Sequence, residues 1–193
     1  ELYKMQVIEG ETPAQTRLGE PERIGFAENM EITALDALDQ MLVDFHAATG
    51  IDAVSVRYAY RSAEEQQELI DKGSSTQVGY SDHHTGMGAQ LGYIREGNSY
   101  VLSTDPVYNW LFENCHKYGF ILRYEEEKEP YTKIGPEGWH FRYVGTDLAM
   151  ELKDSGLCLE EYLDALTDDG STCGNRNSGS NRKACSYGQC GRN

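Results

Sequence analysis

The spacing of apolar residues changes from a helical to a strand repeat between residues 33 and 60, and this change constrains the fold more than any other feature. Thr33 is placed to cap the expected helix, and Gly50 to end it. Five apolar residues share one face of that helix: Leu35, Leu38, Met41, Leu42 and Phe45. Four residues then alternate as in a half-buried strand: Val54, Val56, Tyr58 and Tyr60. The pattern predicts a helix that packs on a sheet.

The rest of the chain mixes helices and strands without a regular βαβ rhythm. Ser62 and Glu65 form a capping box that opens a second helix, and Asp105-Pro106 opens a third. The expected helices are 62–72, 105–118, 146–153 and 159–166, and the expected further strands are 88–94, 120–124 and 139–144. The charged run Glu125–Glu129 predicts a solvated turn. These elements favour an α+β domain with a small antiparallel sheet flanked by helices.

Three regions differ in composition. Residues 1–32 have weak periodicity and predict an extended arm, residues 33–166 carry the folded domain, and residues 167–193 form a polar tail that contains Cys. The chain starts at Glu1 without an initiator Met, so we expect a processed N-terminus. No stretch approaches the roughly 18–20 apolar residues that a membrane span needs.

The net charge of −15 argues against nucleic acid and against anionic membrane surfaces as partners, because both require basic residues. Such acidity mostly keeps a domain soluble. Of the five cysteines, Cys173, Cys185 and Cys190 lie in the tail, with spacings that match no standard zinc ribbon. Two interpretations of the tail remain open: a disulfide-pinned segment in an oxidising compartment, or a mobile basic segment. Cys115 lies among apolar residues and is expected to be buried.

Two polar segments hold three of the five histidines. The first reads Ser81-Asp-His-His-Thr-Gly-Met-Gly-Ala-Gln90, and the second Glu137-Gly-Trp-His-Phe-Arg-Tyr-Val-Gly145. Taken alone, a His in a Gly-rich loop is ordinary, and His140 beside Trp139 is typical of a packed core histidine. Their combination is what points to chemistry.

Together the two segments resemble the signature of the VanY-like D-alanyl-D-alanine carboxypeptidases, the zinc D,D- and L,D-carboxypeptidases of peptidoglycan. That pattern is S-x-H-x-x-G-x-A-x-D followed downstream by E-x-W-H. Ser81, His83 and Gly86 match the first motif, and Glu137, Trp139 and His140 match the second. Tyr60-Arg61-Ser62 also resembles the family. The resemblance covers roughly residues 33–165 and implies a hedgehog/DD-peptidase-like fold.

The resemblance implies a role for each matching residue. His83 and His140 are expected to bind Zn²⁺, and Glu137 to act as general base on a water molecule. Arg61 is expected to bind the substrate carboxylate or the developing oxyanion, although a salt bridge to a nearby Glu is the rival interpretation. Ser81 is expected to hydrogen-bond the bound peptide. Glu137 and His140 are three residues apart, so they share a face only if the backbone bends just before the strand.

The sequence departs from the family pattern at two positions of the first motif. Gln90 stands where the family has its aspartate ligand, and Gly88 stands where alanine is usual. A neutral amide is a poor zinc ligand. Three outcomes remain open: weak coordination by Gln90, substitution by Asp82 or His84, or a site without metal.

Two functions follow from these expectations. The first is a zinc-dependent carboxypeptidase, possessing a weakened metal site, that cleaves a C-terminal D-alanine or a similar residue from peptidoglycan stem peptides. The second is a catalytically inactive member that binds cell-wall peptides. Both place the protein outside the cell or at the cell envelope.

Overall fold

The computed structural model describes residues 30–51, 54–74, 76–95, 98–101 and 108–168. The expected arm up to residue 29, the Asp105-Pro106 helix start and the tail from residue 169 lie outside the described residues. The helices are α1 (Ile32–Thr49), α2 (Ala63–Asp71), α3 (Asn109–Asn114), α4 (Glu129–Thr132), α5 (Thr146–Ser155) and α6 (Leu159–Asp168). The 3-10 helices are η1 (Asp82–Thr85), η3 (Cys115–Tyr118) and η4 (Glu126–Lys128).

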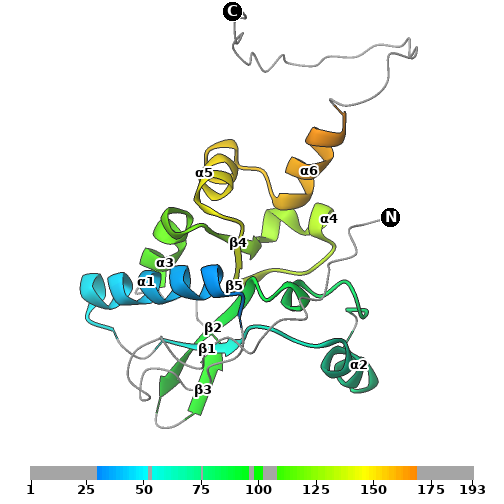
Figure 1. Cartoon of the computed structure of the whole chain (residues 1–193), viewed down its shortest axis with the longest axis horizontal. Helices are drawn as coiled ribbons and strands as arrows, with labels where there is room; N and C mark the ends of the chain where they lie inside the picture. The colour runs from blue at the N-terminus through cyan, green and yellow to red at the C-terminus, as the bar shows by residue number, and fades with distance from the viewer. Residues whose placement is uncertain (1–29, 52–53, 75, 96–97, 102–107, 169–193) are drawn as a thin grey trace, which may run out of the picture.

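One antiparallel sheet joins the five strands of the described residues (Figure 1). The strands are β1 (Val54–Tyr58), β2 (Gly88–Arg95), β3 (Asn98–Val101), β4 (Phe120–Tyr124) and β5 (Glu137–Tyr143). Their order is β1-β2-β5-β4, and β3 pairs with β2 beside its end. The mixed helical and antiparallel architecture confirms the predicted α+β class. Strand β3 had no sequence prediction.

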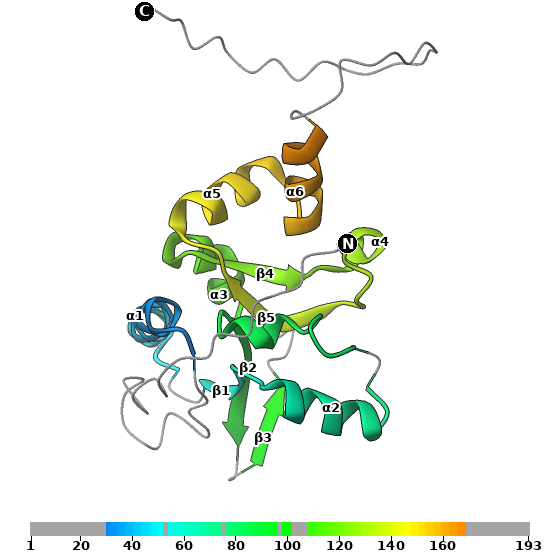
Figure 2. The ribbon, with the colours of Figure 1, turned by 45° about the vertical axis from the view of Figure 1, so that its right-hand side comes forward.

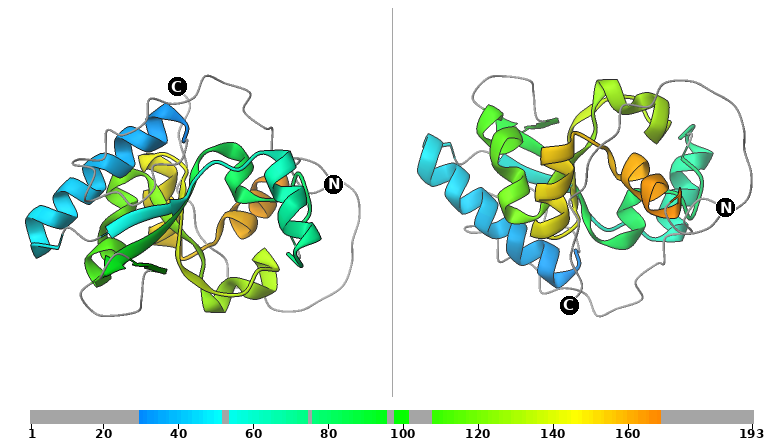
Figure 3. Two further views of the ribbon diagram at one scale, coloured as in Figure 1. Left: turned by 90° about the horizontal axis from the view of Figure 1, so that it is seen from below. Right: turned by 90° about the horizontal axis from the view of Figure 1, so that it is seen from above.

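The hydrophobic core lies between α1 and the sheet. Figure 3 shows α1, α3 and α5 on one side of the strands, and α2 and α6 on the other. The predicted apolar face of α1 is buried, apart from Leu42, which is partly buried: Leu35, Leu38, Met41 and Phe45 are each at most 5% exposed. Burial of each such side chain contributes about 1.5–3 kcal/mol. This one-sided packing leaves the opposite face of β2 and β5 available for polar residues.

The ends of several elements differ from the sequence predictions. Helix α1 begins at Ile32 because Glu31, not Thr33, is its N-cap, and the Glu31 carboxylate accepts a hydrogen bond from Ala34 N at 3.0 Å. The capping box of Ser62 and Glu65 is confirmed. The acidic run after β4 is not a simple turn, since it forms η4 and the start of α4. Local hydrogen bonds decide these boundaries, and the apolar pattern does not report them.

Gly119 generates a stability prediction because it ends η3 in a left-handed conformation (φ 81°) against other atoms. An added Cβ would lie 2.7 Å from the Tyr143 ring and 3.0 Å from the backbone of Gly145. Gly156, which ends α5 at φ 67°, has open space around it and is the matched control. We expect Gly156→Ala to lower the free energy of unfolding by about 1–2 kcal/mol, the cost of the left-handed backbone alone.

Gly119→Ala should lower the free energy of unfolding by about 1–3 kcal/mol more than Gly156→Ala, because it adds overpacking to the same backbone cost. Urea unfolding of both variants and the parent measures the difference. Equal losses for the two variants would contradict the close contact at Gly119.

Candidate active site

The pairing of β2 with β5 places two candidate residues directly opposite each other. Gln90 is the register partner of His140, and Ala89 is the partner of Phe141. Because side chains alternate along a strand, the buried Ala89 and Phe141 face the core while Gln90 and His140 face the other side. Opposed residues in an antiparallel pair have their Cβ atoms about 4.5–5.5 Å apart. The sheet therefore brings together two residues that are far apart in the sequence.

His83, on η1, lies beside His140 on this face of the sheet. Its Nδ1 donates a hydrogen bond to the Ala59 carbonyl oxygen at 2.5 Å, so the lone pair of the neutral ring lies on Nε2. That Nε2 is buried and has no hydrogen-bond partner. Burial, followed by the charges of His140 and Arg61, lowers the pKa of His83 to about 3. His83 is therefore a neutral imidazole with an unused acceptor at neutral pH.

The rings of His83 and His140 meet with their centroids 4.9 Å apart. His140 Nδ1 lies 3.0 Å from Glu137 Oε2, and the amide nitrogen of Gln90 donates to the same Glu137 oxygen at 3.3 Å. Burial alone would lower the pKa of His140, but its hydrogen bonds to Asp82 and Glu137 outweigh burial and raise the pKa. The two histidines, Gln90 and Glu137 thus form one cluster.

An irregularity inside the sheet lets Glu137 and His140 share this face. Leu122 pairs with Phe141, and a regular register would then pair Tyr124 with residue 139. Tyr124 pairs with Glu137 instead, so β5 contains two extra residues between these pairs. The expected departure from regular strand geometry is therefore present, but it lies between Glu137 and Phe141, inside β5, rather than ahead of the strand. The bulge lies within β5, where the apolar alternation of the sequence gives no sign of it.

Asp82 lies behind His140 rather than beside its Nδ1. Its Oδ2 is 3.3 Å from His140 Nε2, on the opposite edge of the imidazole from Glu137. The His84 ring makes a different contact: its Nδ1 donates a hydrogen bond to the Arg61 carbonyl oxygen at 2.7 Å. In the described part of the chain, no three His, Cys, Asp or Glu residues are grouped to hold a metal ion. Neither Asp82 nor His84 therefore completes a ligand set with the two histidines.

The donor atoms present suit a divalent cation only with a neutral third ligand. His83 Nε2 is an orphaned buried acceptor, and His140 Nδ1 faces the same cluster. Gln90 offers an amide, whose oxygen and nitrogen exchange places by rotation of the side-chain end. Two imidazoles and one amide oxygen therefore fit zinc, without the negative charge that a carboxylate would add.

The two other candidate residues also border the cluster. Arg61 donates from its guanidinium to Gln66 Oε1 at 3.0 Å and lies over the Tyr58 ring. Its backbone N–H donates to the His83 carbonyl oxygen. Ser81 is buried at the N-cap of η1, and its side chain makes no capping hydrogen bond. The hydrogen bond expected between Ser81 and a bound peptide stays a prediction.

A cavity of about 510 Å³ borders this cluster through Tyr124. The Tyr124 ring packs edge-on against His140, with centroids 4.9 Å apart. Tyr80 and Tyr131, both more than half exposed, also line the cavity. A concave, partly aromatic space next to the cluster is large enough for part of a peptide.

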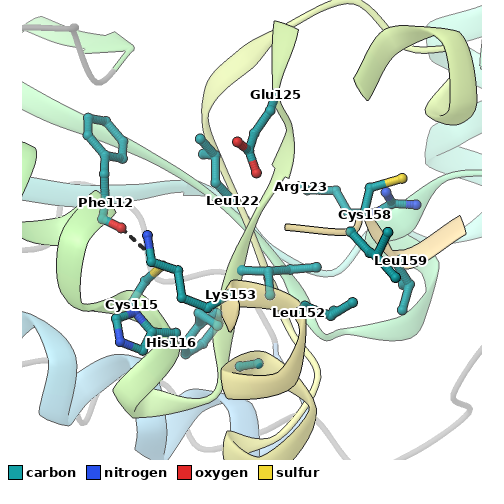
Figure 4. Close-up of a pocket in the computed structure, with 14 residues that line it drawn as sticks. Phe112, Cys115, His116, Leu122, Arg123, Glu125, Leu152, Lys153, Cys158 and Leu159 are labelled. Atoms are coloured by element: carbon teal, nitrogen blue, oxygen red, sulfur yellow. Dashed lines mark hydrogen bonds between the residues drawn. The ribbon is translucent and has the colours of Figure 1, made fainter. Parts of the chain in front are cut away.

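A second cavity, of about 230 Å³, lies between η3, β4 and α5 (Figure 4). It contains Cys115 and Cys158, which are free thiols. Cys115 is 4% exposed, and burial raises its pKa to about 11, which confirms the expected small buried residue. This cavity shares Arg123 and Leu159 with the first but includes neither candidate histidine.

Sequence reasoning missed the residues that link the cluster to α6. Arg123, which is 6% exposed, lies 3.7 Å from Asp82 and donates to both carboxylate oxygens of Glu160. An Arg on an otherwise apolar strand is a weak sign of a buried ion pair. Its partner could not be identified, because 37 residues separate Arg123 from Glu160.

Comparison with known proteins gives a consistent family. The family model described as VanY, D-alanyl-D-alanine carboxypeptidase, matches residues 27–146. A D-alanyl-D-alanine carboxypeptidase of Enterococcus faecalis is 35% identical over 78% of this chain, which spans 61% of that relative's length. This chain thus accounts for less than two thirds of that protein.

Two solved structures are similar in fold. One is a mutant of the vancomycin resistance D,D-pentapeptidase VanY in complex with Zn(II), at 29% identity and a TM-score of 0.61, covering 72% of this chain and 86% of that one. The other is the LD-carboxypeptidase LdcB, at 28% identity and a TM-score of 0.66, covering 80% and 79% of the two chains.

The Arg123–Glu160 pair generates a pH prediction. Burial alone would raise the pKa of Glu160, but the hydrogen bond and charge of Arg123 outweigh it and lower the pKa below the ordinary 4.5. A carboxylate whose pKa is lowered on folding stabilises the fold above the unfolded pKa, and this contribution is lost as the pH falls through the folded value. We expect Glu160→Gln to lower the free energy of unfolding by about 2 kcal/mol at pH 7.

The difference between the parent and Glu160→Gln should shrink as the pH is lowered below about 4.5, in urea titrations at successive pH values. Glu64→Gln, at an exposed position on α2, is the control and should match the parent. A gap between the parent and Glu160→Gln that stays constant down to acid pH would contradict the ion pair.

Proposed function

Because the chain belongs to the VanY family of D-alanyl-D-alanine carboxypeptidases, we propose that it is a hydrolase of peptidoglycan stem peptides. It removes a C-terminal D-alanine or a similar residue and uses a weakened zinc site. Relatives include both D,D- and L,D-carboxypeptidases, so the proposed substrate class is a peptide with a free C-terminal carboxylate.

One observation carries the proposal. The His83 and His140 rings converge from η1 and β5, and Glu137 Oε2 lies 3.0 Å from His140 Nδ1. Two imidazoles with one nearby carboxylate are the parts that a zinc peptidase needs: ligands for the ion and a base for the water. A domain that only binds peptides has no use for that carboxylate.

His83 Nε2, His140 Nδ1 and the amide oxygen of Gln90 would hold the ion. When bound, zinc supplies Lewis-acid chemistry, because it lowers the pKa of water and polarises a carbonyl. A neutral third ligand gives weaker retention of the ion than a carboxylate would, since the Coulomb attraction of one charge is lost. The weaker zinc binding proposed for this chain is therefore a consequence of Gln90, which stands in place of the aspartate ligand.

The other residues handle the peptide and its protons. Glu137 takes a proton from the attacking water and delivers it to the departing amine nitrogen as the peptide bond breaks. Arg61, near His83, binds the terminal carboxylate through its guanidinium. Ser81 contributes a hydrogen bond to the peptide. The cavity beside Tyr124 accommodates the upstream part of the stem peptide.

A second candidate function is an inactive domain that binds cell-wall peptides. It is favoured by the hydrogen bond from the Gln90 amide to Glu137, because this bond ties up the proposed base within the cluster. The two functions differ in metal content. Near-stoichiometric zinc in the purified protein supports the enzyme, and a protein that stays metal-free after dialysis against zinc supports the binding domain.

Either function places the protein at the cell envelope, where peptidoglycan lies. The three tail cysteines support this location if they form disulfides, because disulfides persist in oxidising compartments. No helix in the described part of the chain has the length and apolar character needed to cross a membrane.

Glu137→Gln tests the base. We expect the rate of D-alanine release from a stem pentapeptide to fall by about 10²- to 10⁴-fold, because an amide cannot accept the proton. Zinc content should stay unchanged, since the ligand atoms remain. Glu127→Gln, at an exposed position on η4, is the control and should keep the parent's rate. Unchanged hydrolysis by Glu137→Gln would refute the assignment.

Gln90→Asp tests the weakened ligand. The added carboxylate should tighten zinc binding by about tenfold or more, since each 1.4 kcal/mol of added attraction is a factor of ten. Competition with a chelating dye measures the affinity, and Gln67→Asp on the exposed face of α2 adds the same charge away from the cluster as control. If Gln90→Asp gains zinc and hydrolysis that the parent lacks, the parent is a binding domain.

A further inference from the structure

The carboxylate of Asp82 is buried between one imidazole and two guanidinium groups. Asp82 is 2% exposed, and its Oδ2 lies 3.3 Å from His140 Nε2. Its Oδ1 accepts a hydrogen bond from the Arg142 guanidinium at 2.6 Å, and Arg123 Nε lies 3.7 Å from the same oxygen. Each oxygen of the carboxylate thus has its own partner.

Both arginines are themselves held in place. Arg142 also donates to Thr85 Oγ1 at 2.8 Å and to its neighbour's carbonyl oxygen at 3.1 Å. Arg123 is held by the two oxygens of Glu160. A carboxylate anchored by fixed cations cannot rotate freely, so Oδ2 stays directed at His140.

Gly88 supplies the space that this carboxylate occupies. A Cβ at Gly88 would lie 2.8 Å from Asp82 Oδ2 and 3.3 Å from His140 Nε2. The first distance is shorter than real Cβ contacts, so a methyl group at position 88 would force the Asp82 carboxylate to shift from its place beside His140. The missing side chain at position 88, one of the chain's two departures from the family motif, therefore has a physical reason.

We propose that Asp82 is a positioning residue for His140 and that Gly88 makes room for it. By accepting a hydrogen bond from Nε2–H at 3.3 Å, Asp82 holds the His140 ring with Nδ1 directed at Gln90 and Glu137. The catalytic consequence of this arrangement rests on the proposed function, but the arrangement itself does not.

This pairing matters more in a site whose third ligand is neutral. A carboxylate hydrogen-bonded to a metal-binding histidine orients the ring and raises the basicity of its other nitrogen, and its loss typically costs about 10- to 100-fold in metal affinity. Because Gln90 adds no charge at the ligand position, the nearest negative charge on this side of the site is that of Asp82, which contacts the far nitrogen of His140. It supports ion binding through His140 rather than by direct contact.

Asp82→Asn gives the sharpest test, because an amide has one acceptor oxygen where the carboxylate has two. The Arg142 guanidinium always carries its protons and therefore takes that oxygen. The amide N–H of the variant then faces His140 Nε2, and the ring must move its proton to Nδ1. Gly88→Ala should instead push the carboxylate away from His140 and reduce, without abolishing, the Nε2-bound form.

The tautomer is measured in long-range proton–nitrogen correlation spectra of the metal-free protein, at a pH where the His140 ring is neutral. We expect both the Nε2-bound form, which faces Asp82, and the Nδ1-bound form, which faces Glu137, in the parent, and only the Nδ1-bound form in Asp82→Asn. Gly138→Ala is the control for Gly88→Ala, because it adds the same methyl group on β5 with no atom within 4 Å. It should give the parent spectrum.

Zinc affinity provides a second measurement, by competition with a chelating dye. Asp82→Asn and Gly88→Ala should each bind zinc about 10- to 100-fold more weakly than the parent, and the double variant should be no weaker than Asp82→Asn alone. Losses that multiply in the double variant would mean that the two residues act separately and would overturn the linkage.

The absence of any Nε2-bound proton in the parent, or a spectrum left unchanged by Asp82→Asn, would overturn the positioning role. These spectra require neither metal nor substrate. A protein that proves to be an inactive binding domain would therefore still give a clear result for Asp82.

Discussion

The pairing of β2 with β5 is the constraint on which the rest of the structure depends. Three consecutive residue pairs join the strands: Gly88 with Arg142, Ala89 with Phe141, and Gln90 with His140. The middle pair closes the core beneath α1, and the outer two pairs face the other side. Figure 2 shows β2 and β5 in the middle of the ribbon, with α1 beside them. Because side chains alternate along both strands, one ladder fixes the core and the polar cluster together. A register slip of one residue would exchange the two faces.

The polar face contains buried charges that are paired with one another. Asp82 lies between Arg142 and Arg123, and Glu160 of α6 neutralises the outer guanidinium. Removal of one partner from such a group leaves a buried charge without compensation, which is costly, whereas the complete group is roughly neutral in its contribution to stability. We infer that the network gives the cluster a fixed geometry more than it adds to stability. The family-model match ends at residue 146, so α6 extends this network beyond the matched region.

The sequence predicted the regular elements well and the irregular ones poorly. The buried face of α1 and the Ser62–Glu65 capping box depend on residues a few positions apart, and both are confirmed. The bulge that brings Glu137 beside His140 depends instead on how β4 meets β5, and it lies within β5 rather than ahead of the strand as predicted. Likewise, the motif drew attention to His83 and His140 but not to the buried contact between Asp82 and His140.

The sequence by itself determined the residue types at the cluster, the loss of the carboxylate at Gln90, and the helices and strands on which these residues lie. These are local properties, set by side-chain chemistry and by periodicity along the chain. Only the tertiary structure decided which edge of His140 faces Glu137, that Asp82 occupies the space left by Gly88, and that Glu160 completes the charge pairing. The Asp82–His140 and Arg123–Glu160 contacts join residues 58 and 37 positions apart. The contacts between residues close in the sequence also depend on strand register and packing, which no short stretch of sequence encodes.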